Sequence, residues 1–165
     1  STGEVMGIDY DYKAALSKAL TASGLNLAPN GNILVSIADK DKAEVVSLIR
    51  DIISAGYGVY ATEGTASMMD ALGLPVTMIM KRLDEGHPNV VDVIQDKSVD
   101  AVLNTISGGR GPIQDGFRIR RAAVERRIPC YTSLDTARAA VESLLHGSDG
   151  YNVRPLRDYR DGCDR

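Results

Sequence analysis

Short apolar runs alternate along the chain with segments that have helical periodicity. Five apolar runs have the length and composition that are typical of buried strands. They are residues 33–37, 58–61, 75–80, 99–103 and 128–131. Around them, apolar residues recur at spacings of three and four, which predicts amphipathic helices. The expected helices are residues 9–23, 41–55, 65–72, 90–95, 114–127 and 134–146.

This alternation predicts an α/β fold of three layers, α/β/α, with a five-stranded parallel sheet and a leading helix in front of it. Five strands favour a flavodoxin-like order over a long dinucleotide-binding fold. Three of the expected helices are predicted to end at the glycine that follows them, because glycine readily takes the left-handed conformation that follows a helix. These glycines are Gly24, Gly56 and Gly73.

The pattern divides the chain into three parts. Residues 1–30 are expected to form a lead-in segment with a helix, and residues 31–147 the α/β domain. Residues 148–165 contain Gly150, Pro155 and many charges, and are predicted to be a loosely ordered tail. The opening residues form no clean element and lack an initiator methionine, so we expect a piece of a longer chain.

Composition narrows the classes of function. The chain has 165 residues, of which 44% are hydrophobic and 25% charged, as is ordinary for a globular protein. Its net charge of -3 provides no broad positive field for nucleic acid, and its apolar stretches are too interrupted to span a membrane. Two cysteines, Cys130 and Cys163, cannot build a disulfide framework, so we expect a reducing, cytoplasmic location. His87 and His146 stand apart from other potential ligands, and no metal site is expected.

Groups that bind phosphate follow most of the predicted strands. In open parallel sheets, ligands bind beyond the carboxyl ends of the strands. Lysine ammonium groups neutralise an anion, hydroxyls and amides donate hydrogen bonds to it, and glycine lets the backbone approach it. The candidate binding residues are Lys42, Thr62, Gly64, Thr65, Lys81, Asn104, Thr105 and Ser107.

The sharpest of these segments runs from Thr62 to Thr65. Thr62 ends a predicted strand, and Thr65 is expected to cap the next helix, whose amino end favours an anion. Gly64 keeps the turn free of side-chain bulk. An ordinary strand-to-helix turn with a threonine cap has the same pattern, so this segment alone does not decide between the two interpretations.

The other candidates also have plainer explanations. Lys42 lies in the first turn of its helix, where a cation opposes the helix dipole, but an exposed lysine there costs little. Lys81 can equally be a solvated strand end, and Asn104 and Ser107 can be turn formers. Their convergence at one edge of the sheet favours a ligand that carries phosphate. Neither a Walker loop nor a G-x-S-x-G motif is present, and we expect no catalytic residues.

Five short segments carry a family resemblance: residues 35–42, 61–66, Lys81 with 85–86, 104–105 and 119–123. Together they resemble the methylglyoxal-synthase-like domains. Within that family they look like the carboxyl-terminal regulatory domains of carbamoyl-phosphate synthetase large subunits, and the opening residues 1–7 resemble the segment that leads out of the second ATP-grasp half of that subunit. The resemblance covers roughly residues 1–146.

The resemblance implies a methylglyoxal-synthase-like fold and a regulatory part of a larger enzyme. That enzyme is an ATP-dependent, glutamine-hydrolysing ligase that uses Mg or Mn with its ATP and supplies carbamoyl phosphate to pyrimidine and arginine synthesis. The implied partners are the rest of the large subunit, the glutaminase small subunit and a further copy in a homo-oligomer. No cofactor is implied for this domain itself.

The resemblance also implies a ligand, a nucleotide monophosphate such as UMP as inhibitor or IMP as activator. Lys42, Thr62, Thr65 and Lys81 match the phosphate site, and Asn104 matches a contact to the ribose or base. Two positions depart from family patterns. Ile106 replaces a hydroxyl that nucleotide-responsive members often have, and Cys130-Tyr131-Thr132 replaces the Tyr-Asp-Thr of ornithine-responsive members.

The alternative is a stand-alone lyase of the methylglyoxal synthase type, acting on dihydroxyacetone phosphate. That enzyme needs acidic residues and a histidine around its active site. This chain has no histidine between His87 and His146, and Asp115 alone does not rebuild the set.

Overall fold

Five short strands form one parallel sheet in the computed structural model, which describes residues 4–81, 86–106, 110–146 and 153–162. The strands are β1 (Asn32–Ser36), β2 (Gly58–Thr62), β3 (Thr77–Ile79), β4 (Ala101–Asn104) and β5 (Cys130–Tyr131). All neighbouring strands pair in parallel. The predicted five-stranded parallel sheet is therefore confirmed, with strand bounds that differ from the expected ones by a few residues.

The order of the strands corrects the prediction. The order is β3-β2-β1-β4-β5, whereas a flavodoxin-like sheet has the order 2-1-3-4-5. The chain adds β2 and β3 on one side of β1, and then returns to the other side of β1 to add β4 and β5. The direction of winding thus reverses between β1 and β4, and that switch point is where open α/β sheets bind ligands.

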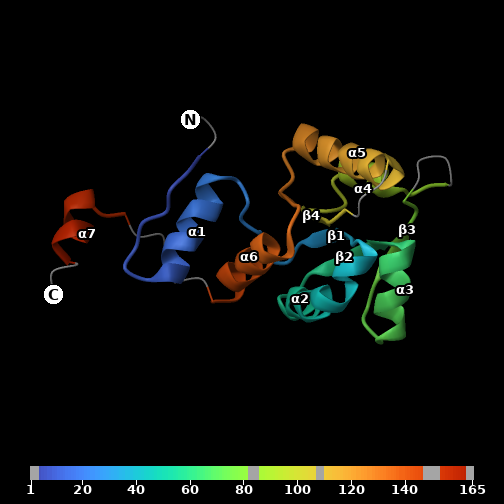
Figure 1. Cartoon of the computed structure of the whole chain (residues 1–165), viewed down its shortest axis with the longest axis horizontal. Coiled ribbons are helices and arrows are strands. Elements are labelled where there is room, and N and C mark those ends of the chain that lie inside the picture. The colour runs from blue at the N-terminus through green and yellow to red at the C-terminus, as the bar shows by residue number, and fades with distance from the viewer. Residues whose placement is uncertain (1–3, 82–85, 107–109, 147–152, 163–165) are drawn as a thin grey trace.

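Helices cover both faces of the sheet and complete the three predicted layers (Figure 1). One face packs against α2 (Lys42–Ser54), α3 (Glu63–Ala71) and α6 (Leu134–His146). The other packs against α4 (Val90–Gln95) and α5 (Arg110–Arg126).

Alternate residues of the central strands enter the two cores. Ile33 and Val35 of β1 belong to the core under α2 and α6, whereas Leu34 between them belongs to the core under α4 and α5. Because both faces are covered, these strands are continuously apolar, as is typical of parallel sheets.

The predicted helix ends at glycine are confirmed. Gly24, Gly56 and Gly73 follow α1 (Tyr12–Ala22), α2 and α3, with φ of +69°, +87° and +67°. Each next residue donates its N–H to a carbonyl five positions back, as in Leu25 to Leu20 at 2.8 Å. This 6→1 bond is the Schellman ending, which needs the left-handed conformation that glycine takes without a steric penalty.

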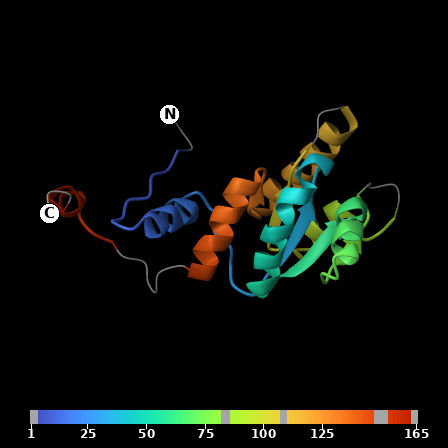
Figure 2. The same ribbon diagram turned by 60° about the horizontal axis from the view of Figure 1, so that its bottom comes forward.

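The lead-in helix α1 packs on α6, and Leu20 of α1 is buried in the larger core. A second helix lies beyond it, α7 (Leu156–Gly162), within the segment predicted to be a loosely ordered tail. The prediction was wrong for this stretch. The ring of Tyr159 in α7 packs against that of Tyr10 at a tilt, with ring centroids 5.1 Å apart, and the Tyr159 hydroxyl accepts a hydrogen bond from Lys18 Nζ at 3.1 Å. Figures 1 and 2 both place α1 and α7 at the end of the molecule away from α3.

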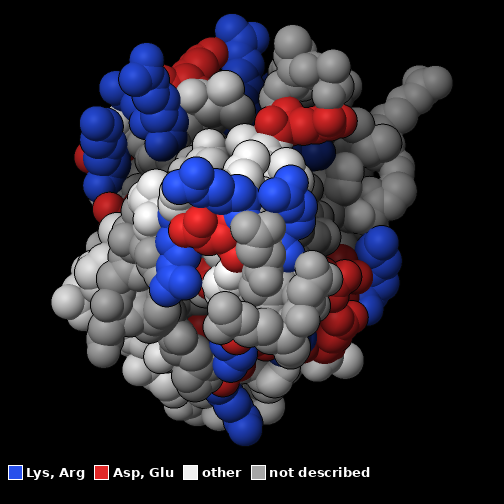
Figure 3. All heavy atoms as spheres, turned by 90° about the vertical axis from the view of Figure 1, so that its left-hand side faces the viewer, with Lys and Arg blue, Asp and Glu red and all other residues white. Residues whose placement is uncertain are grey.

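Charge is mixed on the end of the molecule that Figure 3 faces, where basic and acidic side chains lie interspersed. No described helix is both long and apolar enough to cross a lipid bilayer.

Candidate functional site

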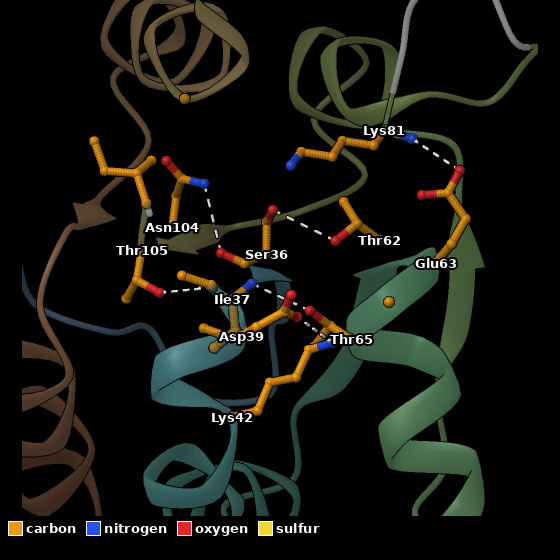
Figure 4. Close-up of a pocket in the computed structure, with 14 residues that line it drawn as sticks. Ser36, Ile37, Asp39, Lys42, Thr62, Glu63, Thr65, Lys81, Asn104 and Thr105 are labelled. Carbon is orange, nitrogen blue, oxygen red and sulfur yellow. Dashed lines mark hydrogen bonds and ion pairs between the residues drawn. The ribbon is translucent and has the colours of Figure 1, made fainter. Parts of the chain in front are cut away.

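A cavity of about 140 Å³ opens beyond the carboxyl ends of β1, β2 and β4, at the switch point of the sheet. Figure 4 shows the residues around it, which come from six separate parts of the chain. Seven of the eight candidate binding residues line this one cavity, and Ser107 lies outside the described residues. The seven are Lys42, Thr62, Gly64, Thr65, Lys81, Asn104 and Thr105.

Buried polar side chains concentrate at this cavity. Among the described residues, every buried polar or charged residue except Asn89 lines it. They are Ser36, Thr62, Thr65, Asn104 and Thr105. Burying a polar group costs free energy unless it is hydrogen-bonded, so such a concentration is typical of a binding site rather than of a core.

Two threonine hydroxyls hold the loop that follows β1. The Thr65 Oγ1 accepts the N–H of Ile37 at 3.1 Å, and the Thr105 Oγ1 accepts the N–H of Ala38 at 2.9 Å. A hydroxyl that accepts a bond still has its own hydrogen to donate. Both threonines thus fix the backbone of the cavity and keep a donor for an anion.

The helix after β2 begins earlier than predicted. Helix α3 starts at Glu63, its N-cap is Thr62 without a side-chain capping bond, and Thr65 is its third residue. The prediction that Thr65 caps this helix was therefore wrong, because Glu63 and Gly64 already have helical conformation and the Thr65 hydroxyl bonds to the β1 loop instead. The first N–H groups of α3 have no partner within the helix and line the cavity edge.

Positive charge converges on the same edge. Lys42 lies in the first turn of α2, as predicted, and is the first residue of that helix. A Cβ placed on Gly64 would lie 3.3 Å from the Lys42 Nζ. The Lys42 ammonium thus lies beside the amino end of α3, which carries a partial positive charge of its own. Lys81 lines the same cavity, and its backbone N–H donates to Glu63 Oε1 at 3.5 Å.

One buried oxygen of the cavity has no hydrogen-bond partner. Among the described residues, Asn104 Oδ1 is the buried side-chain polar atom that has no hydrogen-bond partner, and Asn104 is only 3% exposed. The other end of this amide donates from Nδ2 to the Ser36 carbonyl at 3.5 Å. An unsatisfied buried oxygen costs about 1–3 kcal/mol and is retained where a ligand supplies the donor.

Replacing Asn104 by leucine is therefore expected to stabilise the empty chain by about 1 kcal/mol, because it removes an unpaired buried oxygen at similar volume. The Ser36 carbonyl keeps a partner, the Thr105 N–H at 3.1 Å. Urea unfolding monitored by circular dichroism measures the change.

The matched control is the same substitution at Asn89, which is also buried but whose side-chain oxygen is hydrogen-bonded. Its Oδ1 accepts the N–H groups of Val91 and Asp92 at 3.0 and 3.1 Å and caps α4. Asn89→Leu is expected to cost about 1–2 kcal/mol. Equal destabilisation by both substitutions would contradict the interpretation of Asn104.

Several further residues that the sequence had not marked as binding candidates line the cavity, among them three polar residues and a glycine. Ser36, Asp39, Glu63 and Gly116 all contribute to its wall. A hydroxyl in the last position of a central strand was a usable signal for Ser36. Gly116 had no such signal, because only the packing of α5 brings it within reach: a Cβ there would lie 2.6 Å from Ile106 Cγ2 and 3.2 Å from Asn104 Oδ1.

The described residues that line the cavity carry ammonium, hydroxyl, amide and carboxylate groups. No histidine is among the described residues that line the cavity. In the part of the chain that the structure describes, no group of three or more potential metal ligands lies together.

Comparison with known proteins agrees with this geometry. The family model for the MGS-like domain matches residues 44–132, more than half of the chain. The chain belongs to the MGS-like domain family. The match includes Thr62, Lys81 and Asn104, while Lys42 lies just before it.

A relative extends the similarity over almost the whole chain. The carbamoyl phosphate synthase large chain of Thermomicrobium roseum is 50% identical over 160 residues, which are 97% of this chain. The chain spans only 15% of that protein's length. The resemblance to the MGS-like domain of such large chains is thereby confirmed.

Proposed function

We propose that this MGS-like chain is the allosteric effector-binding domain of a carbamoyl-phosphate synthetase large subunit, and that it binds a nucleoside monophosphate such as UMP or IMP. One observation carries the proposal: two lysines and the amino end of α3 surround a cavity in which the buried Asn104 oxygen lacks a partner. The identity to a large chain supports the parent enzyme.

The phosphate occupies the edge formed by Lys42, Lys81 and the amino end of α3. Charge-assisted hydrogen bonds to a dianion are strongest at such a place. The ribose lies toward Asn104, whose oxygen accepts one of its hydroxyl protons. A cavity of about 140 Å³ is smaller than the ~300–1,000 Å³ typical of pockets that enclose a whole ligand, so it holds the headgroup and leaves the base at its mouth.

Ile106 lines the cavity where nucleotide-responsive relatives often have a hydroxyl. Its hydrocarbon contacts the ribose or base without a hydrogen bond. Selectivity between pyrimidine and purine therefore depends less on this position than it does in those relatives.

Regulation requires that the ligand favour one arrangement of this domain against the rest of the enzyme. A coupling of about 1–3 kcal/mol is typical. Helix α5 is suited to transmit it, because its Gly116 lies against Ile106 in the cavity wall while Phe117 and Val124 are exposed on its outer side.

The remaining features of the proposal concern the parent enzyme. It is an ATP-dependent, glutamine-hydrolysing ligase of pyrimidine and arginine synthesis in the cytoplasm, with Mg or Mn bound to its ATP. The partners of this chain are the rest of the large subunit, the glutaminase small subunit and a further copy in a homo-oligomer. The chain has no catalytic residue and no cofactor of its own.

Calorimetric titration of the chain with UMP and IMP tests the proposal. At least one of them is expected to bind saturably, and inorganic phosphate is expected to compete with it. Absence of any heat up to millimolar nucleotide would contradict the proposal. Formation of methylglyoxal from dihydroxyacetone phosphate, followed by a colour assay, would instead support the lyase.

A further inference from the structure

A carboxylate of the protein itself lies within the proposed anion site. Asp39 lines the cavity, and its Oδ1 lies 2.7 Å from the Lys42 Nζ. Figure 4 shows Asp39 and Lys42 pointing toward each other beside Thr65. The ammonium that is placed to hold a phosphate is thus already paired in the unliganded chain.

The surroundings of Asp39 are those that would attract an external anion. The ion pair with Lys42 holds the pKa of the Asp39 carboxyl below its usual range, and the charge of Lys81 lowers that pKa further. The amino end of α3 adds a partial positive charge. It lies close to the ion pair, because the Lys42 Nζ is beside Gly64 in the first turn of α3. Asp39 is therefore a counter-ion at a place where Lys42, Lys81 and the amino end of α3 all contribute positive charge.

Within the part of the chain that the structure describes, the ion pair with Lys42 is the contact that holds this carboxylate. Asp39 begins the short 3₁₀ turn η1 (Asp39–Asp41), and its side chain is 94% exposed. A rotation about its side-chain bonds moves it into solvent without disturbing the core. Exchange of Asp39 for a ligand anion therefore needs no rearrangement of the strands or of α2.

We propose that Asp39 is a built-in competitor of the effector: it neutralises Lys42 in the empty site, leaves when a phosphate monoester binds, and so sets the affinity of the site. The inference rests on the proposed function, since it concerns the same phosphate position. A dianion replaces Asp39 because it offers more charge and more acceptors to Lys42, Lys81 and the α3 amides.

The substitution Asp39→Asn tests this inference in the full chain, because it keeps the shape of the side chain and removes its charge. Inorganic phosphate and UMP are titrated by calorimetry into the original chain and the variant. Affinity of the variant is expected to rise about fivefold, a modest gain because the ion pair that it removes is exposed to solvent.

The matched control is Asp41→Asn, two residues further along the same turn. Asp41 lines a neighbouring hollow and not the cavity, and its side chain makes no capping bond to α2. Asp41→Asn changes the net charge by the same amount as Asp39→Asn. Because salt screens charges outside the cavity, the affinity of the control for phosphate and UMP is expected to stay within about twofold of that of the original chain. An equal gain in both variants would overturn the inference, because general charge would then explain the effect.

Two other outcomes separate this inference from the proposed function. If the original chain binds UMP and Asp39→Asn binds it equally or more weakly, the competitor role is wrong and Asp39 instead positions Lys42. If neither protein binds phosphate or UMP, the proposed function fails and the inference fails with it.

A second measurement does not depend on any substitution. In carboxyl-selective NMR, saturating UMP is expected to raise the pKa of Asp39, because the carboxylate loses its partner Lys42 and meets a nearby dianion. An unchanged pKa of Asp39 in the complex would overturn the inference.

Discussion

Joint replacement of Lys42 and Lys81 by methionine is expected to weaken binding of UMP or IMP about 1,000-fold. Each charge-assisted hydrogen bond contributes roughly 1.5–3 kcal/mol, and a loss of about 4 kcal/mol corresponds to that factor. Both ammonium groups lie at the one cavity where Thr65 and the amino end of α3 also converge. Calorimetric or fluorescence titration of the variant against the original chain measures the loss.

The fold is expected to survive this double substitution. Methionine keeps the apolar stem of lysine, and among the described residues Lys42 pairs with the highly exposed Asp39, a kind of pair that contributes at most about 1 kcal/mol. The matched control replaces Lys40 and Lys13, both exposed, by methionine. It removes the same charge from two residues that do not line the cavity, and should leave binding nearly unchanged. Full binding by the Lys42 and Lys81 variant would show that the phosphate is held elsewhere.

Replacement of Leu34 by alanine is expected to lower the free energy of unfolding by about 3 kcal/mol, within the ~2–5 kcal/mol typical of buried leucine. Leu34 is fully buried in the middle of the central strand β1 and packs in the core beneath α4 and α5. Neighbouring strands hold its backbone on both sides, so the sheet cannot close over the lost volume. Urea unfolding of the chain measures the change.

The control is Leu72→Ala, the same chemical change at the end of α3. Leu72 is 43% exposed, so it loses far less buried surface, and its substitution is expected to cost less than about 1 kcal/mol. Similar losses at both positions would contradict the assignment of Leu34 to the core.

Most of the secondary structure was predictable because it depends on neighbouring residues. The spacing of Val45, Leu48, Ile49, Ile52 and Ile53 predicts the buried face of α2; the first four are buried there and Ile53 is partly buried. The bounds of α4 and α6 agree with the prediction. Helix α7 was missed because its stability comes from contacts of Tyr159 with Tyr10 and Lys18, which are far away in the sequence.

The candidate site was predictable in its residues and less so in its details. The rule that ligands bind at the carboxyl ends of parallel strands selected Lys42, Thr62 and Lys81, and these three do line one cavity. Gly116 could not be predicted from the sequence, because it belongs to a helix that only tertiary packing brings to the cavity. The role of Thr65 was misjudged because its partner, Ile37, lies 28 positions earlier in the chain.

The order of amino acids alone already implied a parallel sheet between two layers of helices, a group of polar residues at one edge of that sheet and the MGS-like family, because each follows from local periodicity or from short sequence motifs. Folding alone decided that β4 lies beside β1, that Asp39 pairs with Lys42, and that the Asn104 oxygen is left without a partner. The order of strands cannot be read from their sequences, because strands buried on both faces are all similarly apolar. The partners of a side chain depend on segments that meet only after the sheet has formed.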